Sequence, residues 1–203
     1  MLNLNRDEPE CFSSFKIKNK PHSYQDDCND YKLRLCLREA LIEEQKYQCF
    51  YCEKKIENDT SKVHIDHIKQ RNIYHTLECE YSNMALSCNG NGEKYCAKYK
   101  DKQGIWDDEK FIRIVAENPE LQENPSDFFI YRANGEVGVK KSLSQNEQER
   151  AINTINYLNL NHKNLIEVRE SIFLQLEMYK SYDYNIDEIF TFFNEFQSIF
   201  KGE

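Results

Sequence analysis

Residues 49–52 read CFYC and residues 87–96 read SCNGNGEKYC. The first stretch is a Cys-x-x-Cys knuckle, a tight turn that lets the thiolates of Cys49 and Cys52 reach one tetrahedral zinc ion. Cys88 and Cys96 supply a second pair, at a longer spacing than the usual one. A redox-active Cys-x-x-Cys needs a strand before it and a helix after it, and neither is predicted. The four cysteines therefore predict a structural zinc ion that organises residues 49–104.

Between the two cysteine pairs, residues 63–71 read VHIDHIKQR. Apolar and polar residues alternate over the first of these positions, which predicts a short strand with His64 and Asp66 on one face. His67 begins the turn that leaves the strand. In metal-assisted phosphodiester cleavage a carboxylate holds a hard cation and a neutral histidine takes a proton from water. Asp66 and His67 have this chemistry, although alone they could equally be zinc ligands or hydrogen-bonded surface groups.

The composition is that of a globular protein with one large domain or two small ones. The chain has 203 residues, of which 39% are hydrophobic. Its first ten residues lack the apolar run of a secretory signal, and no stretch approaches the roughly 20 apolar residues of a membrane span. We expect a cytoplasmic protein without a membrane partner. In a reducing cytoplasm cysteines outside the zinc set are ordinary thiols, and these are Cys11, Cys28, Cys36 and Cys79.

The net charge of −8 argues against a nucleic-acid binder, because neutralising phosphates requires Lys and Arg. The distribution of charge weakens this argument. Residues 61–104 carry 7 basic and 5 acidic side chains, whereas residues 1–60 carry 10 and 12, and residues 105–203 carry 10 and 18. Residues 61–104, the only net-positive segment of the three, therefore contain HIDH, and the acidic residues 105–203 are a solvated surface or a docking face for another protein.

Helical patterns flank the central segment on both sides. In DYKLRLCLREALIEEQ, residues 30–45, Leu33, Cys36, Leu37, Ala40 and Leu41 form the core face of an amphipathic helix. Asn-Gly at 134–135, between two short apolar runs, predicts a β-hairpin. Ser144 and Glu147 are spaced as a capping box that opens a helix, and further helices are predicted over residues 163–179 and 186–200. Phenylalanines at helical spacing in the last helix indicate a core or a partner interface.

The order of these features resembles the HNH, or ββα-metal, nuclease family. A cysteine pair, a strand ending in Asp-His, a loop with Lys69 and Arg71, then SNMALSC and a further cysteine followed by AKYKD carry the resemblance. It implies that Asp66 binds a catalytic Mg²⁺ or Mn²⁺ ion and that His67 is the general base. It also implies that Asn83 braces the loop and orients the histidine.

The sequence departs from the family pattern after the fourth cysteine. The family's final His or Asn normally follows that cysteine directly, and here the position holds Ala97. Asp101, five residues beyond Cys96, is the candidate for the missing metal ligand, and Asn89 and Asn91 are the alternatives.

A narrower resemblance comes from YCEKKI, HIDHIKQR, SCNGNGEKYCAKYKD, ENPSDFFIYRANGEV and NTINYLNLN. These stretches are similar to the PtuB family, the HNH component of Septu anti-phage systems, including versions carried by retrons. The likeness extends from DEP near the start to Arg169. It implies a partner, the ABC-type ATPase PtuA, which holds the nuclease and controls it.

The sequence thus predicts an α+β protein in which a zinc-stapled ββα HNH module lies within a mainly helical domain that has an additional β-hairpin. The expected segments are residues 1–48, helical, 49–104, the nuclease module, and 105–203, the hairpin and helices for partner docking. The expected activity is metal-dependent cleavage of nucleic acid, DNA rather than RNA, in phage defence. Besides Asp66, Asp101, His67 and Asn83, the expected site has His64 as a metal ligand or phosphate contact, and Lys69, Arg71, Lys98 and Lys100 on the nucleic acid.

Two other functions are open on the sequence. One is a catalytically silent zinc module that docks onto a larger complex, with HIDH as a hydrogen-bonded strand end. The other is a toxin-like RNase with the same site chemistry and a different substrate. The Ala97 position favours the silent module, whereas Asp66, His67, Asn83, Lys69 and Arg71 favour cleavage.

Overall fold

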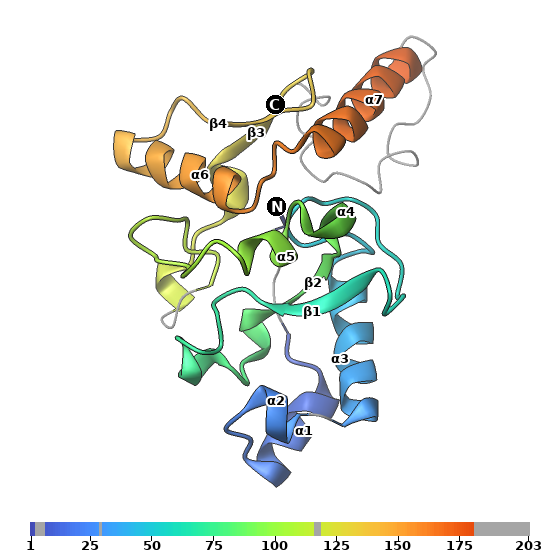
Figure 1. The fold of residues 1–203 in the computed structure, drawn as a ribbon, viewed down its shortest axis with the longest axis vertical. Coiled ribbons are helices and arrows are strands. Elements are labelled where there is room, and N and C mark those ends of the chain that lie inside the picture. The colour runs from blue at the N-terminus through green and yellow to red at the C-terminus, as the bar shows by residue number, and fades with distance from the viewer. Residues whose placement is uncertain (3–6, 29, 116–118, 181–203) are drawn as a thin grey trace.

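The fold is a mixed α+β arrangement with two separate antiparallel sheets of two strands each among helices (Figure 1). This computed structural model describes residues 1–2, 7–28, 30–115 and 119–180. The α+β class predicted from the sequence is confirmed. Among the helices described, none has both the length and the apolar character of a membrane-spanning segment.

Three helices precede the first sheet: α1 (Glu10–Asn19), α2 (Tyr24–Asp27) and α3 (Tyr31–Glu44). The Asp30 side chain begins α3 by accepting a hydrogen bond from the Leu33 backbone N–H at 2.9 Å, as an N-cap residue does. Leu33, Leu37 and Leu41 are buried along one side of α3, and this helix packs against the first sheet. The predicted amphipathic helix is confirmed.

The cysteines outside the zinc set divide into two kinds. Cys11 on α1 and Cys36 on α3 form a disulfide, so the prediction that both are ordinary thiols is wrong. Their pairing follows from the packing of α1 against α3, which joins residues 25 positions apart in the sequence. Cys28 and Cys79 are free and buried, as predicted.

The first sheet pairs β1 (Val63–His67) with β2 (Met84–Cys88), with Val63 opposite Cys88 and His67 opposite Met84. The buried Gln45 amide, just after α3, completes an edge of β2. It accepts from the Leu86 N–H at 2.7 Å and donates to the Leu86 carbonyl at 2.9 Å. Without this side chain the Leu86 N–H would lack a partner, whereas the Leu86 carbonyl would keep the Phe50 N–H at 3.0 Å.

Two 3₁₀ turns, η1 (His75–Leu77) and η2 (Tyr81–Asn83), lie between the strands, and two short helices, α4 (Gly90–Glu93) and α5 (Ala97–Lys100), follow β2. The central segment therefore runs strand, strand, short helix. In Figure 1, α5 lies beside the β1–β2 pair.

The C-terminal part contains the second sheet, followed by two long helices. After η3 (Pro119–Leu121) and η4 (Pro125–Asp127), β3 (Phe129–Tyr131) and β4 (Val137–Val139) form the predicted hairpin. Helix α6 (Gln145–Tyr157) opens with the predicted capping box, in which Ser144 N–H donates to the Glu147 carboxylate at 2.8 Å. Helix α7 (Lys163–Lys180) confirms the helix predicted over residues 163–179. The helix predicted over residues 186–200 lies outside the described residues.

The buried hydrophobic residues form one set that draws on every part of the described chain. Trp106 is fully buried and packs on Phe111 and Tyr157, with ring centroids 5.3 and 5.5 Å away, and these two rings also contact each other at 4.5 Å. The Met1 ammonium group pairs with the Glu53 carboxylate and donates to the Tyr131 hydroxyl at 3.0 Å. These contacts join the chain start, the cysteine knuckle and the hairpin.

Gly135 provides a test of how the hairpin packs on α7. Its φ is +78°, and a Cβ there would lie 2.2 Å from the Ile166 carbonyl oxygen. Gly92 has φ +77° and nothing within 4 Å of the same position, so it is a matched control for backbone strain. We expect Gly135→Ala to lower the free energy of unfolding by about 1–3 kcal/mol more than Gly92→Ala, the usual cost of overpacking. Urea unfolding of both variants measures this difference, and equal losses would contradict the packing.

Candidate metal centre and adjoining groove

Four cysteine sulfurs converge at one end of the first sheet. The Sγ–Sγ distances are 3.9 Å from Cys49 to Cys96, 3.8 Å from Cys52 to Cys88 and 3.9 Å from Cys88 to Cys96. A tetrahedral ion with metal–sulfur bonds of about 2.3 Å requires sulfurs about 3.8 Å apart. The four residues can therefore hold one metal ion, and the cysteine set predicted from the sequence is brought together.

Local backbone geometry explains the long spacing of the second pair. Gly90 has φ +60°, and a Cβ there would lie 2.1 Å from the Tyr95 carbonyl oxygen, so only glycine fits this turn. Asn91, Gly92 and Glu93 also have positive φ. The left-handed path returns the chain to Cys96, whose backbone N–H donates to the Leu158 carbonyl at 2.9 Å.

An open groove of about 790 Å³ runs past β1. Its walls come from β1, the loop that follows β1, and the end of α5. The candidate site residues among its lining are His64, Asp66, His67, Arg71, Lys98 and Asp101. The groove brings together most of the site expected from the sequence.

Asp66 lies in the buried wall of the groove and has two partners on one oxygen. The Tyr51 hydroxyl donates to Oδ2 at 2.5 Å, and the Lys100 ammonium group lies 3.2 Å from the same atom. Burial raises the pKa of the Asp66 carboxyl, and the charge of Lys100 opposes that rise. Asp101 lies on the other side of Lys100, 3.4 Å from its Nζ and half exposed.

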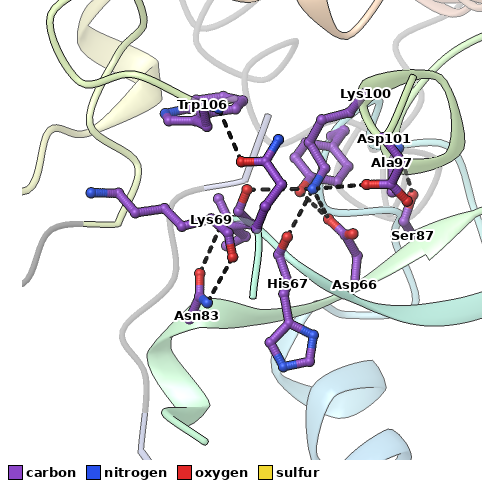
Figure 2. Close-up of polar contacts among 12 residues, drawn as sticks. Asp66, His67, Lys69, Asn83, Ser87, Ala97, Lys100, Asp101 and Trp106 are labelled. Carbon is purple, nitrogen blue, oxygen red and sulfur yellow. Dashed lines mark hydrogen bonds and ion pairs between the residues drawn. The ribbon is translucent and has the colours of Figure 1, made fainter. Parts of the chain in front are cut away.

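Lys100 is fully buried and also donates to the His67 and Ile68 carbonyls, at 2.8 and 3.4 Å. Figure 2 shows its ammonium group between Asp66, Asp101 and the end of β1. The expected contact of Lys100 with nucleic acid is therefore wrong, because its charge is used inside the fold. The expected contact of Lys69 with nucleic acid is wrong for the same reason, since Lys69 is 2% exposed and pairs with Asp108 at 2.7 Å. Arg71 and Lys98 stay at the groove, partly exposed.

His67 projects from β1 on the opposite side to Asp66 (Figure 2). Its Nε2 lies 2.9 Å from the Glu78 carbonyl oxygen, which can only accept, so Nε2 carries the proton and Nδ1 has a lone pair. The Tyr24 ring packs edge-on against the imidazole, with centroids 4.6 Å apart. Burial, together with the Arg71 and Lys100 charges, lowers the pKa of His67 to about 3. The ring is therefore neutral at pH 7.

His64 shares a face of β1 with Asp66, as expected from strand alternation. The Asn89 amide N–H₂ donates to the Ser61 carbonyl at 2.6 Å, which turns Asn89 Oδ1 toward His64 Nδ1, 3.1 Å away. His64 Nδ1 must then donate, and Nε2 has the lone pair. Nε2 is buried and has no hydrogen-bond partner among the described residues.

Asn83 is fully buried and braces the loop between the two strands (Figure 2). Its Oδ1 accepts from the Lys69 N–H at 2.8 Å, and its Nδ2 donates to the Lys69 and Leu77 carbonyls at 3.1 and 3.0 Å. The same loop carries Glu78, whose carbonyl holds His67. The amide thus fixes the segment that orients the imidazole.

No pattern in the sequence indicates the groups that hold Asp66 and His67 in place. Tyr51 lies inside CFYC, where only the two cysteines have a recognisable spacing. Tyr24 and Glu78 carry no motif, so no pattern in the sequence indicates that they reach His67. Asn91, one of the alternatives for the missing ligand, is exposed, and Asn89 is engaged with His64.

The chain matches no protein-family model and no curated protein sequence. The resemblance to HNH nucleases therefore rests on the quoted residues.

Removing the metal tests the four-sulfur centre. We expect one tightly bound metal ion per chain by elemental analysis of protein purified without chelators, and loss of that ion in Cys52→Ser. Because metal binding and folding are coupled in small thiolate modules, the variant should also unfold at lower temperature. Cys79→Ser, which alters a buried free thiol outside the cluster, is the control and should keep its metal. Parent protein that contains no metal would contradict the prediction that the four cysteines hold an ion.

A second test concerns the buried ion pair between Asp66 and Lys100. We expect Lys100→Met to lower the free energy of unfolding by about 3–5 kcal/mol, because it leaves a buried carboxylate uncompensated. Asp66→Asn added to Lys100→Met should recover part of this loss. Lys102→Met, which removes an exposed ion pair with Glu93, is the control and should change stability by about 1 kcal/mol or less. Urea unfolding gives all three values, and similar losses at both lysines would exclude a role for this pair.

Proposed function

We propose that this protein is a metal-dependent endonuclease of the HNH type that hydrolyses phosphodiester bonds of nucleic acid. One observation carries the proposal. A neutral imidazole with a defined lone pair and a buried carboxylate reach the same groove from one strand, beside a four-cysteine metal centre. Hydrolysis of a phosphodiester needs a base for water and a stabiliser of developing negative charge, and these residue types supply both.

His67 is the proposed general base. Its Nε2–H donates to the Glu78 carbonyl, which leaves Nδ1 to take the proton from the attacking water. The Tyr24 ring and the Asn83-braced loop restrict how the imidazole turns, so they are positioning residues. Burial and the nearby Arg71 and Lys100 charges keep the ring neutral, although the hydrogen bond to the Glu78 carbonyl by itself favours protonation.

A divalent ion, Mg²⁺ or Mn²⁺, is the proposed catalytic cofactor, and zinc is the proposed occupant of the four-cysteine centre. The lone pair of buried His64 Nε2 fits a metal ligand, and it lies on the strand face that carries Asp66. Asp66, with His64 or Asp101, would hold the ion, which when bound would polarise a phosphoryl oxygen, whereas all three ligands together are not close enough to share one ion. Arg71 and Lys98 would contact the flanking phosphates.

The wider proposal follows the PtuB resemblance. In it, the nuclease acts in the cytoplasm on phage DNA, as the effector of a defence system with the ATPase PtuA. The acidic residues of segment 105–203 would supply the docking face. A toxin-like RNase has the same catalytic groups, so the substrate assay below separates the two.

A catalytically silent metal-binding module is the second candidate function, and a specific observation favours it. Lys100 already neutralises Asp66, and among the described residues the four cysteines are the only group of three or more potential ligands close enough to share an ion. In this alternative the groove binds its ligand but does not cleave it.

The assay that decides between these functions is incubation of purified protein with plasmid DNA, phage DNA and total RNA in Mg²⁺ or Mn²⁺, with and without the ATPase. Cleavage of DNA supports the proposal, and cleavage of RNA alone supports the RNase. No cleavage under any of these conditions supports the silent module.

Two substitutions at His67 test its role. We expect His67→Ala and His67→Gln to lose cleavage activity by about 10²–10⁴-fold, the usual contribution of a general base. Glutamine keeps an N–H donor for the Glu78 carbonyl, so that variant separates lost chemistry from lost folding. His75→Ala, at an exposed histidine on the same groove, is the control and should cleave normally. Metal content and thermal unfolding are measured in parallel, and full activity of His67→Gln would contradict the assignment.

A further inference from the structure

A second groove of about 850 Å³ opens between α2, the first half of α3 and the segment that leads into β1. It is continuous with the groove described above, because Gln25, His64, Ile65 and Arg71 line both. A linear ligand could therefore pass from the candidate active site into this second groove.

One face of α3 forms a wall of the second groove. Tyr31, Arg34, Leu35 and Arg38 lie at positions i, i+3, i+4 and i+7, which places them on the same side of a helix. Leu33 and Leu37, at intervening positions, are buried in the core. The helix thus presents one aromatic and two cationic side chains to the groove.

Three of the four arginines described outside this groove pair with a carboxylate, and the fourth, Arg169, is buried and donates to the Gly135 and Leu160 carbonyls. Arg113 and Arg150 pair with Glu123, and Arg132 pairs with Glu136. In contrast, Arg34, Arg38 and Arg71 form no ion pair with a carboxylate in the part of the chain that the structure describes. The lining holds one carboxylate, Asp59, which binds Ser61 and Lys62. In a chain of net charge −8, three unpaired guanidinium groups at one groove indicate an anionic ligand.

Arg38 gives an independent indication of an anion. It is 8% exposed, with Nε bound to Asn58 at 3.2 Å and Nη1 to the Val63 carbonyl at 3.3 Å. Its Nη2 is buried and has no hydrogen-bond partner among the described residues. Arg38 forms no ion pair, and the charge of Asp59 offsets the cost of its burial only in part, so an anion in the groove would offset more of that cost.

Tyr24 links the arginines to the candidate base. The Arg34 and Arg71 guanidinium groups lie 5.9 and 5.7 Å from the centre of the Tyr24 ring, and the same ring packs against His67. These contacts hold two cations next to the imidazole. Tyr31 lies at the far end of the groove and is 77% exposed. Packing inside the fold therefore does not explain why an aromatic ring is at this position.

We propose that this groove binds one strand of nucleic acid beside the cleaved bond, with Arg34, Arg38 and Arg71 along the phosphates and an unstacked base on Tyr31. Arginine with an exposed aromatic ring is the usual composition of a single-strand site, because phosphates meet the cations and bases stack on the ring. A base inside a duplex does not present its face to a side chain, so the groove favours a single strand. This inference rests on the proposed function and adds the substrate form that the site takes.

Binding is tested in the His67→Gln background, so that the result does not depend on cleavage. Fluorescence anisotropy with a short labelled DNA strand, an RNA strand of the same sequence and the DNA duplex gives the three affinities. We expect a single strand to bind more tightly than the duplex, and the DNA and RNA arms show which strand is preferred. Equal or tighter binding of the duplex would overturn the single-strand assignment.

Two variants test the residues. Tyr31→Ala should weaken single-strand binding by about fivefold or more, the loss typical of one base stack. Arg34→Ala should weaken it and lower the salt dependence by about 0.7 in log–log slope, as expected for one lost phosphate contact on a single strand. Tyr47→Ala and Arg132→Ala alter an exposed tyrosine and an exposed arginine outside the groove, and are the controls. Thermal unfolding of each variant verifies that it is folded.

The outcomes separate this inference from the proposed function. Parent-like binding by both groove variants overturns the groove, whatever the cleavage assay shows. Equal losses in the control variants also overturn it, because binding would then depend on general charge. Selective loss in the groove variants supports it, even if the unsubstituted protein cleaves nothing and the hydrolysis proposal fails.

Discussion

The convergence of four cysteine sulfurs is the constraint on which the central part of the molecule depends. Cys49 and Cys52 come from a knuckle after α3, Cys88 ends β2, and Cys96 precedes α5. Three segments that are separate in the sequence, the knuckle, the end of β2 and the start of α5, are thereby fixed to one point. A metal ion bound there would contribute folding free energy directly, since thiolate sites do not exist in the unfolded chain.

The position of Cys96 decides where α5 lies, and α5 decides the charge of the groove. Lys100 is four residues after Cys96, so its ammonium group enters the fold beside Asp66 and the carbonyls at the end of β1. The metal centre and the candidate active site are therefore mechanically connected through one turn of helix. The connection also explains how a buried carboxylate persists next to the groove, because Lys100 and Tyr51 provide a charge and a hydrogen bond that offset its burial.

The two faces of the molecule around β1 serve different tasks. His64 and Asp66 share one face of β1, whereas His67 projects toward α2 and the loop between the strands. Both faces open to one groove, and the cationic side of α3 continues from it. A strand at the junction of these surfaces can present a carboxylate and an imidazole from adjacent residues without their competing for space, because successive side chains alternate.

The sequence by itself determined the features that depend on short-range spacing. The Cys49–Cys52 knuckle, the strand at HIDH, the helix of residues 31–44, the hairpin at Asn134–Gly135 and the Ser144 capping box each arise from short-range spacing, and each is present in the structure. Only the tertiary structure decided which distant groups meet. The Cys11–Cys36 disulfide, the burial of Lys69 and Lys100, Tyr51 on Asp66 and the Glu78 carbonyl on His67 have no local pattern. From the sequence alone, Lys100 is expected at the surface. In the fold a carboxylate and two carbonyls surround it, so its role depends on long-range packing and not on its neighbours in sequence.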